Sequence, residues 1–239
     1  MDMKKVMLTA ITALMLCSVA FAQDKDTNKK KVEGSGNIIT KEVNVQSFDE
    51  ISASGVYSLV FIQGSKEGVK IEADDNLQEL FEVTNEGSKL KIAMKKDINF
   101  NSEAKLKVYV TFNKLKAMNL KMVGSTRNEG QLSFDNLAIN SKGVGNVELK
   151  LSVKKLDVDN KGVGDLRLSG KAEDVTIHNK GVGSVDAADF VVQKMNIENT
   201  GVGHAEVNAE KELTVKESFL GKVRNKGAAA MKKTGKTSS

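Results

Sequence analysis

From about Val32 onward, apolar and polar residues alternate in short stretches that are rich in β-branched side chains. This two-residue period is typical of half-buried β-strands. It predicts strands at, for example, 57–61, 90–92 and 106–110, and a single helical turn at 76–81. Proline is absent, which suits a stack of strands in which every interior backbone N–H is needed as a donor. We therefore predict an all-β chain.

A short glycine motif interrupts this pattern at regular intervals. The tripeptide Gly-Val-Gly starts at residues 143, 162, 181 and 201, so successive copies lie 19, 19 and 20 residues apart. A constant period of about 20 residues indicates a solenoid in which each repeat forms one coil. Equivalent residues of successive coils then form columns at the strand spacing of ~4.8 Å. We expect one β-solenoid with about 20 residues and two or three short strands per turn.

The aligned repeats predict the content of these columns. The valines between the glycines are expected to form an apolar column that points inward, and the glycines to allow tight corners because they tolerate positive φ. The asparagines before each motif are expected to form a hydrogen-bonded ladder. The valines are Val144, Val163, Val182 and Val202, and the asparagines are Asn160, Asn179 and Asn199.

Residues 1–22 have the features of a secretory signal peptide. Two lysines precede an apolar run that ends in Ala20-Phe21-Ala22, a small-x-small cleavage site. Cys17 follows Leu16 rather than a small residue, so a lipid anchor at Cys17 is not expected. The apolar run is too short for a membrane span. We expect an exported protein without a transmembrane segment, located in the periplasm, at the outer membrane or outside the cell.

The mature chain divides into three parts by composition. A polar leader covers 23–33, the β-helix domain 34–227, and a basic, disordered tail 228–239. The formal net charge is +5, and six basic residues but no acidic residue follow Glu217. No aromatic residue interleaves with these charges and no nucleic-acid-reading module is visible, so nucleic acid is not an expected partner. Cys17 is the only cysteine, so disulfides do not stabilise the mature domain.

The lysines that precede the glycine motifs are the candidate binding residues. Lys142, Lys161 and Lys180 occupy the same repeat position, which Thr200 takes in the next copy. One interpretation is an anion-binding stripe for acidic or sulfated glycans or lipopolysaccharide. The other is a solvated row that discourages edge-to-edge aggregation, as lysine does on sheet edges.

The pattern of acidic residues does not indicate a catalytic centre. Glycan cleavage requires carboxylates that converge on one bond, whereas Asp165 and Asp186 occupy different positions in their turns. His178 and His204 also differ in repeat position, so a zinc site is not indicated. We expect no catalytic residue, no metal and no cofactor.

Three segments before the repeats carry a resemblance to a known family. They are Gly34-Ser35-Gly36-Asn37-Ile38, Phe48-Asp49-Glu50-Ile51 and Ser54-Gly55-Val56-Tyr57. Together with the Gly-Val-Gly turns, they make about residues 34–227 resemble the exported bacterial family described as putative autotransporter adhesin, head GIN domain. The resemblance implies a single-stranded right-handed parallel β-helix, no established catalytic residues and an adhesion role.

Three functional hypotheses remain open at this point. The leading one is an exported, non-enzymatic β-solenoid that serves as a cell-adhesion or envelope interaction module and contacts glycan or a cell-surface protein. The second is a polysaccharide lyase or hydrolase on the same scaffold, with Asp165 or Asp186 in its site. The third is an envelope scaffold whose basic tail docks on anionic lipid. Because a solenoid exposes sheet edges at its ends, self-association into a homo-oligomer is a further expectation.

Overall fold

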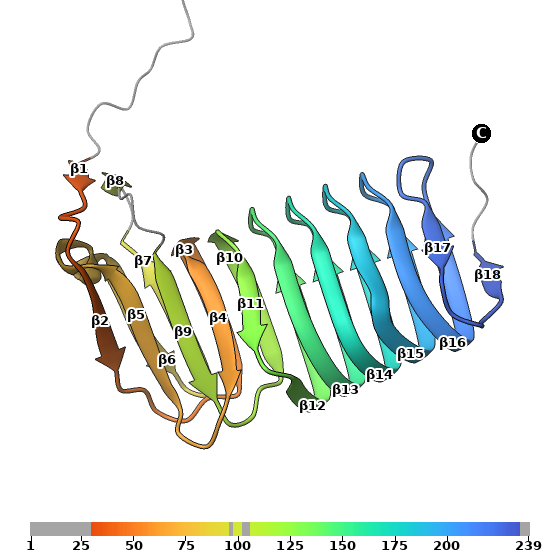
Figure 1. Ribbon diagram of the computed structural model, residues 1–239, viewed down its shortest axis with the longest axis horizontal. Helices are drawn as coiled ribbons and strands as arrows, with labels where there is room; N and C mark the ends of the chain where they lie inside the picture. Colours follow the sequence, from red (N-terminus) through yellow and green to blue (C-terminus); the bar gives the residue numbers. More distant parts are fainter. Residues whose placement is uncertain (1–29, 96–97, 102–105, 235–239) are drawn as a thin grey trace, which may run out of the picture.

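The computed structural model describes residues 30–95, 98–101 and 106–234. Strands lie side by side along one axis and form an elongated stack (Figure 1), which confirms the predicted β-solenoid. The predicted signal peptide, with Cys17, lies outside the described residues. Within the described residues, no helix has the length and apolar character that are needed to cross a membrane.

The N-terminal part of the stack mixes antiparallel and parallel strands. Strands β2–β5, β5–β9 and β6–β7 pair antiparallel, whereas β3–β7 and β4–β9 pair parallel. The helical turn predicted at 76–81 is confirmed as the short 3₁₀ helix η1. The elements are β2 (Ile38–Val43), β3 (Glu50–Val56), β4 (Ser58–Gln63), β5 (Gly68–Asp74), η1 (Asp75–Leu80), β6 (Phe81–Glu86), β7 (Lys89–Met94) and β9 (Lys107–Phe112).

A separate two-stranded parallel sheet joins β1 (Lys30–Glu33) to β8 (Ile98–Asn101). The segment predicted as a polar leader, 23–33, therefore ends in a strand. Asn76 Nδ2 donates a hydrogen bond to the Glu33 carbonyl oxygen at 2.7 Å. This bond attaches the small sheet to η1.

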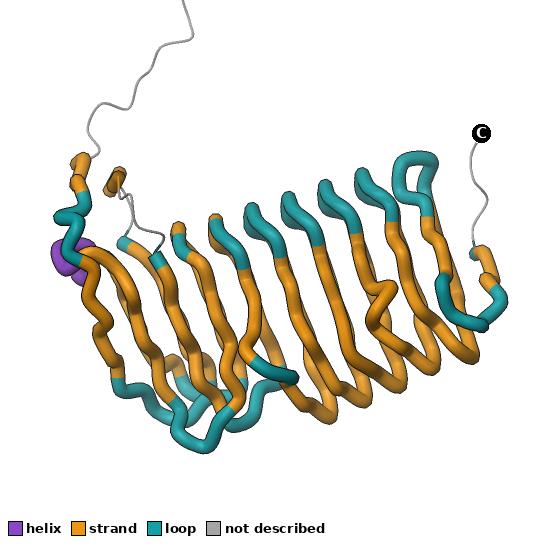
Figure 2. Tube along the Cα trace, viewed as in Figure 1, coloured by secondary structure: helices purple, strands orange, loops and turns teal. Residues whose placement is uncertain are grey.

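The remaining strands form the regular coils, and all of their pairs are parallel. Each of β13 to β16 is one continuous strand of 13 to 15 residues that bends near its middle, rather than two or three short strands. Figure 2 shows both arms of each coil. The strands are β10 (Ala117–Val123), β11 (Thr126–Glu129), β12 (Leu132–Ser141), β13 (Val147–Asn160), β14 (Leu166–Asn179), β15 (Val185–Asn199), β16 (Ala205–Glu217), β17 (Val223–Asn225) and β18 (Met231–Lys233).

The stack has two long edges, which lie at the top and the bottom of Figure 1. We call the first the loop edge; it consists of the corner loops centred on Val123, Val144, Val163, Val182 and Val202. We call the second the bend edge; it consists of the turns before β10 and β12 and the midpoints of β13 to β15. Between the edges, the side chains of both arms alternate between solvent and a shared apolar core.

The inward valine column predicted from the repeats is wrong. Val144, Val163, Val182 and Val202 point outward and are each 49–50% exposed. The glycines take the interior positions instead, because a Cβ on Gly164 would lie 2.4 Å from the Gly145 carbonyl oxygen of the preceding coil. The corner is therefore too narrow for an inward side chain. The second glycine of each motif has φ between +131° and +137°, as expected for a tight corner.

The predicted asparagine ladder is confirmed. Asn160 Nδ2 donates to Asn179 Oδ1 at 2.8 Å, and Asn179 Nδ2 donates to Asn199 Oδ1 at 2.7 Å. The three side chains lie inside the stack, directly beneath the loop edge, and are at most 6% exposed. Ser141 precedes them in this column and Glu217 follows them. Each buried amide thus has a partner in the next coil, which offsets its desolvation cost.

The C-terminal end is capped by residues that the sequence assigned partly to a disordered tail. Strand β18, at 231–233, pairs with β16, so the boundary predicted at residue 228 is wrong for this segment; residues 235–239 lie outside the described range. Glu217 connects the cap to the last full coil. Its Oε1 lies 2.5 Å from Lys233 Nζ, and its Oε2 accepts the Val223 N–H at 2.9 Å. The prediction of a disordered tail failed because the carboxylate that anchors the cap belongs to β16 and not to the tail itself.

The cap is expected to loosen in acid. Burial alone raises the pKa of Glu217, but the hydrogen bonds from Lys233 and from Val223 N–H outweigh it and hold the pKa below the ordinary 4.5. A carboxyl with a lowered pKa stabilises the fold above its ordinary pKa and loses that contribution as the pH falls through the lowered value. The protection factors of the amides at 223–225 and 231–233, which correct for slower intrinsic exchange in acid, should fall below about pH 4.5. In Glu217→Gln, the protection factors of these amides should already be below those of the wild type at pH 7. Protection factors that are unchanged by acid in the wild type would contradict this assignment.

Candidate functional site

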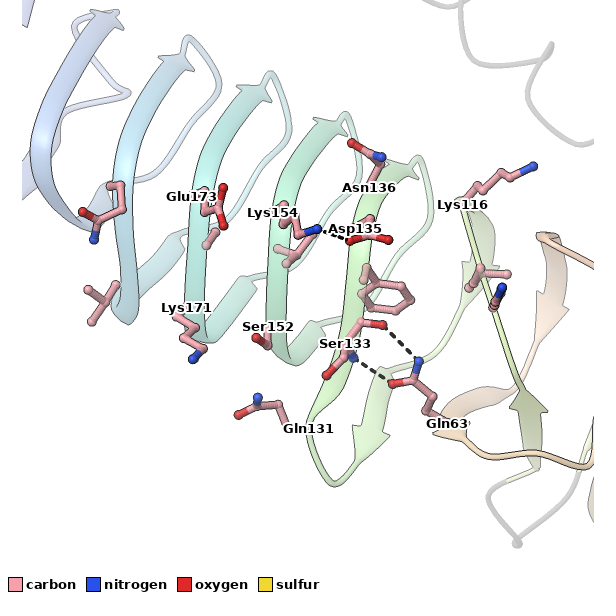
Figure 3. A pocket seen from close by; sticks show the side chains of 18 of the residues that line it. Gln63, Lys116, Gln131, Ser133, Asp135, Asn136, Ser152, Lys154, Lys171 and Glu173 are labelled. Carbon is pink, nitrogen blue, oxygen red and sulfur yellow. Dashed lines mark hydrogen bonds and ion pairs between the residues drawn. The ribbon is translucent and has the colours of Figure 1, made fainter.

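A groove of about 1500 Å³ runs along the bend edge, across successive coils (Figure 3). It begins beside Gln63 at the end of β4, follows the turn before β10, and continues over the midpoints of β12 to β15. Most of its lining side chains carry amide, hydroxyl or charged groups. The polar lining includes Gln63, Asn113, Lys116, Gln131, Ser133, Asp135, Asn136, Ser152, Lys154, Lys171, Glu173 and Gln193.

The carboxamide of Gln63 forms one wall of the groove. Its Nε2 donates to the Ser133 carbonyl oxygen at 3.0 Å, and its Oε1 accepts the Ser133 N–H at 2.8 Å. Figure 3 shows this pair of bonds. The amide therefore pairs with the backbone of β12 as a neighbouring strand would. This contact fixes the position of the start of β12 relative to the end of β4.

Charges of opposite sign follow one another along the groove. Asp135 Oδ1 lies 2.7 Å from Lys154 Nζ, and Glu173, one coil further on, adds to the field at Lys154. The lysine hydrogen bond lowers the pKa of Asp135, and the same bond raises the pKa of Lys154. Both groups are therefore charged at neutral pH. Both side chains are also largely exposed, so the pair adds little stability and presents charge to solvent.

Apolar side chains form the floor beneath these polar groups. Phe134 packs parallel to Phe112 with ring centroids 5.9 Å apart, and Phe112 contacts Phe61 edge to face at 6.2 Å. Val153 and Ala172 continue the column of Phe134 in the next two coils. Phe134 is only partly buried, so one apolar surface faces the groove. The floor is rigid because its members belong to the core.

Several amides in the groove are available for a ligand. Within the described part of the chain, the side chains of Gln131, Asn136 and Gln193 form no hydrogen bond, and all three are at least partly exposed. Amides and hydroxyls both donate and accept hydrogen bonds. The groove thus suits a ligand that is rich in hydroxyl groups.

The three lysines that the sequence singled out lie on the loop edge, far from the groove along each coil. Lys142, Lys161 and Lys180 are exposed and occupy equivalent positions, since the backbone N–H of each bonds to the preceding coil. Lys161 Nζ is 2.6 Å from Asp159 Oδ2. Their alignment agrees with the predicted row, and their use in binding stays a proposal.

The acidic residues considered for catalysis do not form a convergent pair. Asp165 Oδ2 is 2.6 Å from Arg167, and its Oδ1 accepts the Ser184 N–H of the next coil at 3.0 Å. Asp186 pairs in register with Arg167 on one side and Glu206 on the other. The carboxylate of Asp165 is thus used to connect coils.

The two histidines lie on different surfaces. His178 Nδ1 is 3.3 Å from Glu198 Oε2, whereas His204 belongs to a corner loop. Among the described residues, no group of three or more His, Cys, Asp or Glu side chains is placed to hold a metal ion.

The sequence did not indicate the groove, because the bends carry no repeated motif. Its polar residues differ from coil to coil, and Gln63 and Ser133 are 70 residues apart. The spacing of the glycine motifs could have located this edge, because the residues midway between successive motifs must form the opposite edge of each coil.

Stacked parallel coils with capped ends define the chain as a β-solenoid. It belongs to the family described as "Putative auto-transporter adhesin, head GIN domain", which matches residues 47–229. This confirms the resemblance seen in the segments before the glycine repeats. A comparison with curated proteins finds no match.

Solved structures of bacterial proteins share the fold. A "putative adhesin" from Bacteroides fragilis is 29% identical with a TM-score of 0.74, over 85% of this chain and 100% of that chain. A "putative adhesin" from Parabacteroides distasonis is 23% identical with a TM-score of 0.63, over 87% and 98%. A "Putative lipid binding protein" from Parabacteroides distasonis is 20% identical with a TM-score of 0.60, over 86% and 100%.

Proposed function

We propose that this chain is an exported, non-enzymatic adhesion module that holds an extended glycan in the groove of the bend edge. The main support is a long groove, lined by hydroxyl and amide groups, that crosses successive coils. Each coil contributes its own polar groups at a fixed spacing, which suits a polymer of repeated sugar units. Membership of an adhesin family agrees with a role in contact with a surface partner.

The charges of the groove favour binding over cleavage. A general acid for glycoside hydrolysis needs a raised pKa, whereas the pKa of Asp135 is lowered by Lys154. A general base for a lyase needs a pKa close to the working pH, whereas the pKa of Lys154 is raised by Asp135. The ion pair thus leaves both groups poorly suited to proton transfer.

Binding to immobilised polysaccharides tests this proposal. The panel should include neutral, sulfated and uronate-containing polymers, and the wild-type chain should bind at least one of them above background. Combined replacement of Gln131, Asn136 and Gln193 by alanine should weaken that binding about 10-fold or more, since each lost hydrogen bond costs roughly 1 kcal/mol. Binding should be measured by biolayer interferometry on protein whose melting temperature matches the wild type.

The matched control is alanine at Asn44, Gln46 and Asn196, which are exposed amides outside the groove. This control should bind as the wild type does. Equal affinities of the groove variant and the control, or no binding to any polymer, would argue against the groove as a glycan site. Release of reducing or unsaturated ends from a polymer, lost on replacing Asp165 or Asp186, would instead assign the chain to the enzymes.

A further inference from the structure

The loop edge carries a continuous row of exposed apolar side chains. Each central valine pairs with the next along the stack, from Val123 through Val202, and Val56 pairs with Val123 at the N-terminal side. Gly203 N–H bonds to the Leu220 carbonyl oxygen, which adds Leu220 as the last member. The row consists of Val56, Val123, Val144, Val163, Val182, Val202 and Leu220, which are 48–56% exposed.

This row differs from the scattered apolar residues of ordinary protein surfaces. Single exposed valines would need no explanation. Here, however, seven members at the strand spacing of ~4.8 Å make a continuous strip roughly 29 Å long. Phe219, beside Leu220, is 84% exposed. It belongs to the β16–β17 loop, which extends further than its neighbours in Figure 1. Contiguous apolar strips of this kind mark contact surfaces.

Cations accompany the apolar row. Lys121, Lys142, Lys161 and Lys180 lie two residues before their valines, and Lys222 lies two residues after Leu220. The loops contribute one carboxylate at the equivalent positions, Asp165, and it is paired with Arg167 at 2.6 Å. Lys161 pairs with Asp159 at 2.6 Å and Lys222 lies 3.7 Å from Glu217, whereas Lys121, Lys142 and Lys180 form no ion pair with another described residue. The strip is thus apolar along its centre and positive at its side.

This chemistry selects one kind of partner. A second copy of the chain laid antiparallel on the same strip would bring two lysine rows together, which opposes association. A lipid surface accepts all of these features, because apolar side chains enter the headgroup region while lysines reach the phosphates.

We propose that the loop edge lies on an anionic lipid surface, with Phe219 and Leu220 inserted at one end and the lysine row against the headgroups. The glycan groove on the opposite edge then faces away from the membrane. All coils would have the same orientation relative to the membrane, because their corner loops lie in one line (Figure 1).

Vesicle co-sedimentation tests the proposal. The mature chain, residues 23–239, should bind vesicles of phosphatidylglycerol and phosphatidylcholine, and bind pure phosphatidylcholine at least tenfold more weakly. Replacing Lys142, Lys161 and Lys180 by glutamine should weaken binding roughly 100-fold at low salt, because each lysine near an anionic surface contributes about fivefold. The double variant Phe219→Ser, Leu220→Ser should lose about tenfold or more.

The charge-matched control replaces Lys66, Lys150 and Lys211 by glutamine; these exposed lysines lie away from the loop edge. It should bind as the wild type does. A general effect of net charge would instead weaken both triple variants equally. Equal loss in the two triple variants, or equal binding to both vesicle types, would overturn the proposal. Self-association in sedimentation velocity that the Phe219 and Leu220 replacements abolish would assign the edge to a second copy, and capture of a soluble acidic protein instead of vesicles would assign it to a protein partner.

The vesicle result is separable from the glycan result. The groove variant with alanine at Gln131, Asn136 and Gln193 should keep its vesicle binding, and the loop-edge variants should keep their polysaccharide binding. Failure of one assay with success of the other would identify which edge was assigned wrongly.

Discussion

Gly164→Ala should lower the free energy of unfolding by about 3–5 kcal/mol, because it combines a strained backbone with a collision against another main chain. Gly164 has φ +131°, which residues with a Cβ rarely adopt. The added methyl would lie 2.4 Å from the carbonyl oxygen of Gly145 in the preceding coil. The neighbour cannot move aside alone, since its own coil is bonded in the same way to the coil before it. Urea unfolding followed by circular dichroism measures the change.

Gly68→Ala is the matched control for this effect. Gly68 lies at the start of β5, and an added Cβ there would meet open space. Its replacement should change the free energy of unfolding by less than about 1 kcal/mol. Similar stabilities of the two variants would show that the corner glycines can be replaced, and that the narrow corner does not account for the repeat.

Asn179→Leu should destabilise the fold by about 2–4 kcal/mol, because a side chain of similar size removes both hydrogen bonds of the ladder at that point. The replacement leaves Asn160 Nδ2 without its acceptor and Asn199 Oδ1 without its donor, and both of these atoms belong to buried side chains. Thermal unfolding and hydrogen exchange of β13 to β15 should both report the change.

Two further variants separate the ladder from a general effect of leucine. Asn196→Leu alters an exposed position of the neighbouring strand β15 and should be nearly neutral. Replacing Asn160, Asn179 and Asn199 together should cost far less than three times the single change, because fewer polar atoms are left without partners. A single variant no worse than Asn196→Leu would show that the ladder contributes little.

The sequence was sufficient to predict the coil and its polar column. The 19-residue spacing set the register that pairs Val158 with Ile177, and the asparagines at equal positions bonded to one another as expected. The outward direction of the valine side chains could also have been predicted by counting alternate positions along the strand. Alternation carried back from the buried Leu149 through Val147 places Gly145 inside and Val144 outside. The prediction failed because it assumed that an apolar column must be interior.

Other features depend on contacts that no local pattern contains. The antiparallel pairing of β2 with β5 joins segments outside the repeat, and the bond between Gln63 and Ser133 spans 70 residues. The groove therefore became visible only when the bends of several coils were placed side by side. The C-terminal cap likewise depends on Glu217, whose side chain is only 7% exposed although it reads as one more charged residue in the sequence.

The asparagine ladder also gives the stack a direction. Each amide donates toward the C-terminal side, from Asn160 to Asn179 and from Asn179 to Asn199, so the side-chain dipoles add instead of cancelling. Their positive end faces the coil in which a carboxylate, Glu217, replaces the amide. A negative charge at that end is favourable, and Asn199 Nδ2, the last amide donor of the ladder, bonds to the backbone carbonyl oxygens of Gly203 and Lys222. The ladder thus ends at the coil that carries the acid. An extra coil with its own asparagine could be inserted between two asparagines without disturbing either end. The number of amides before the acid therefore determines the length of the stack.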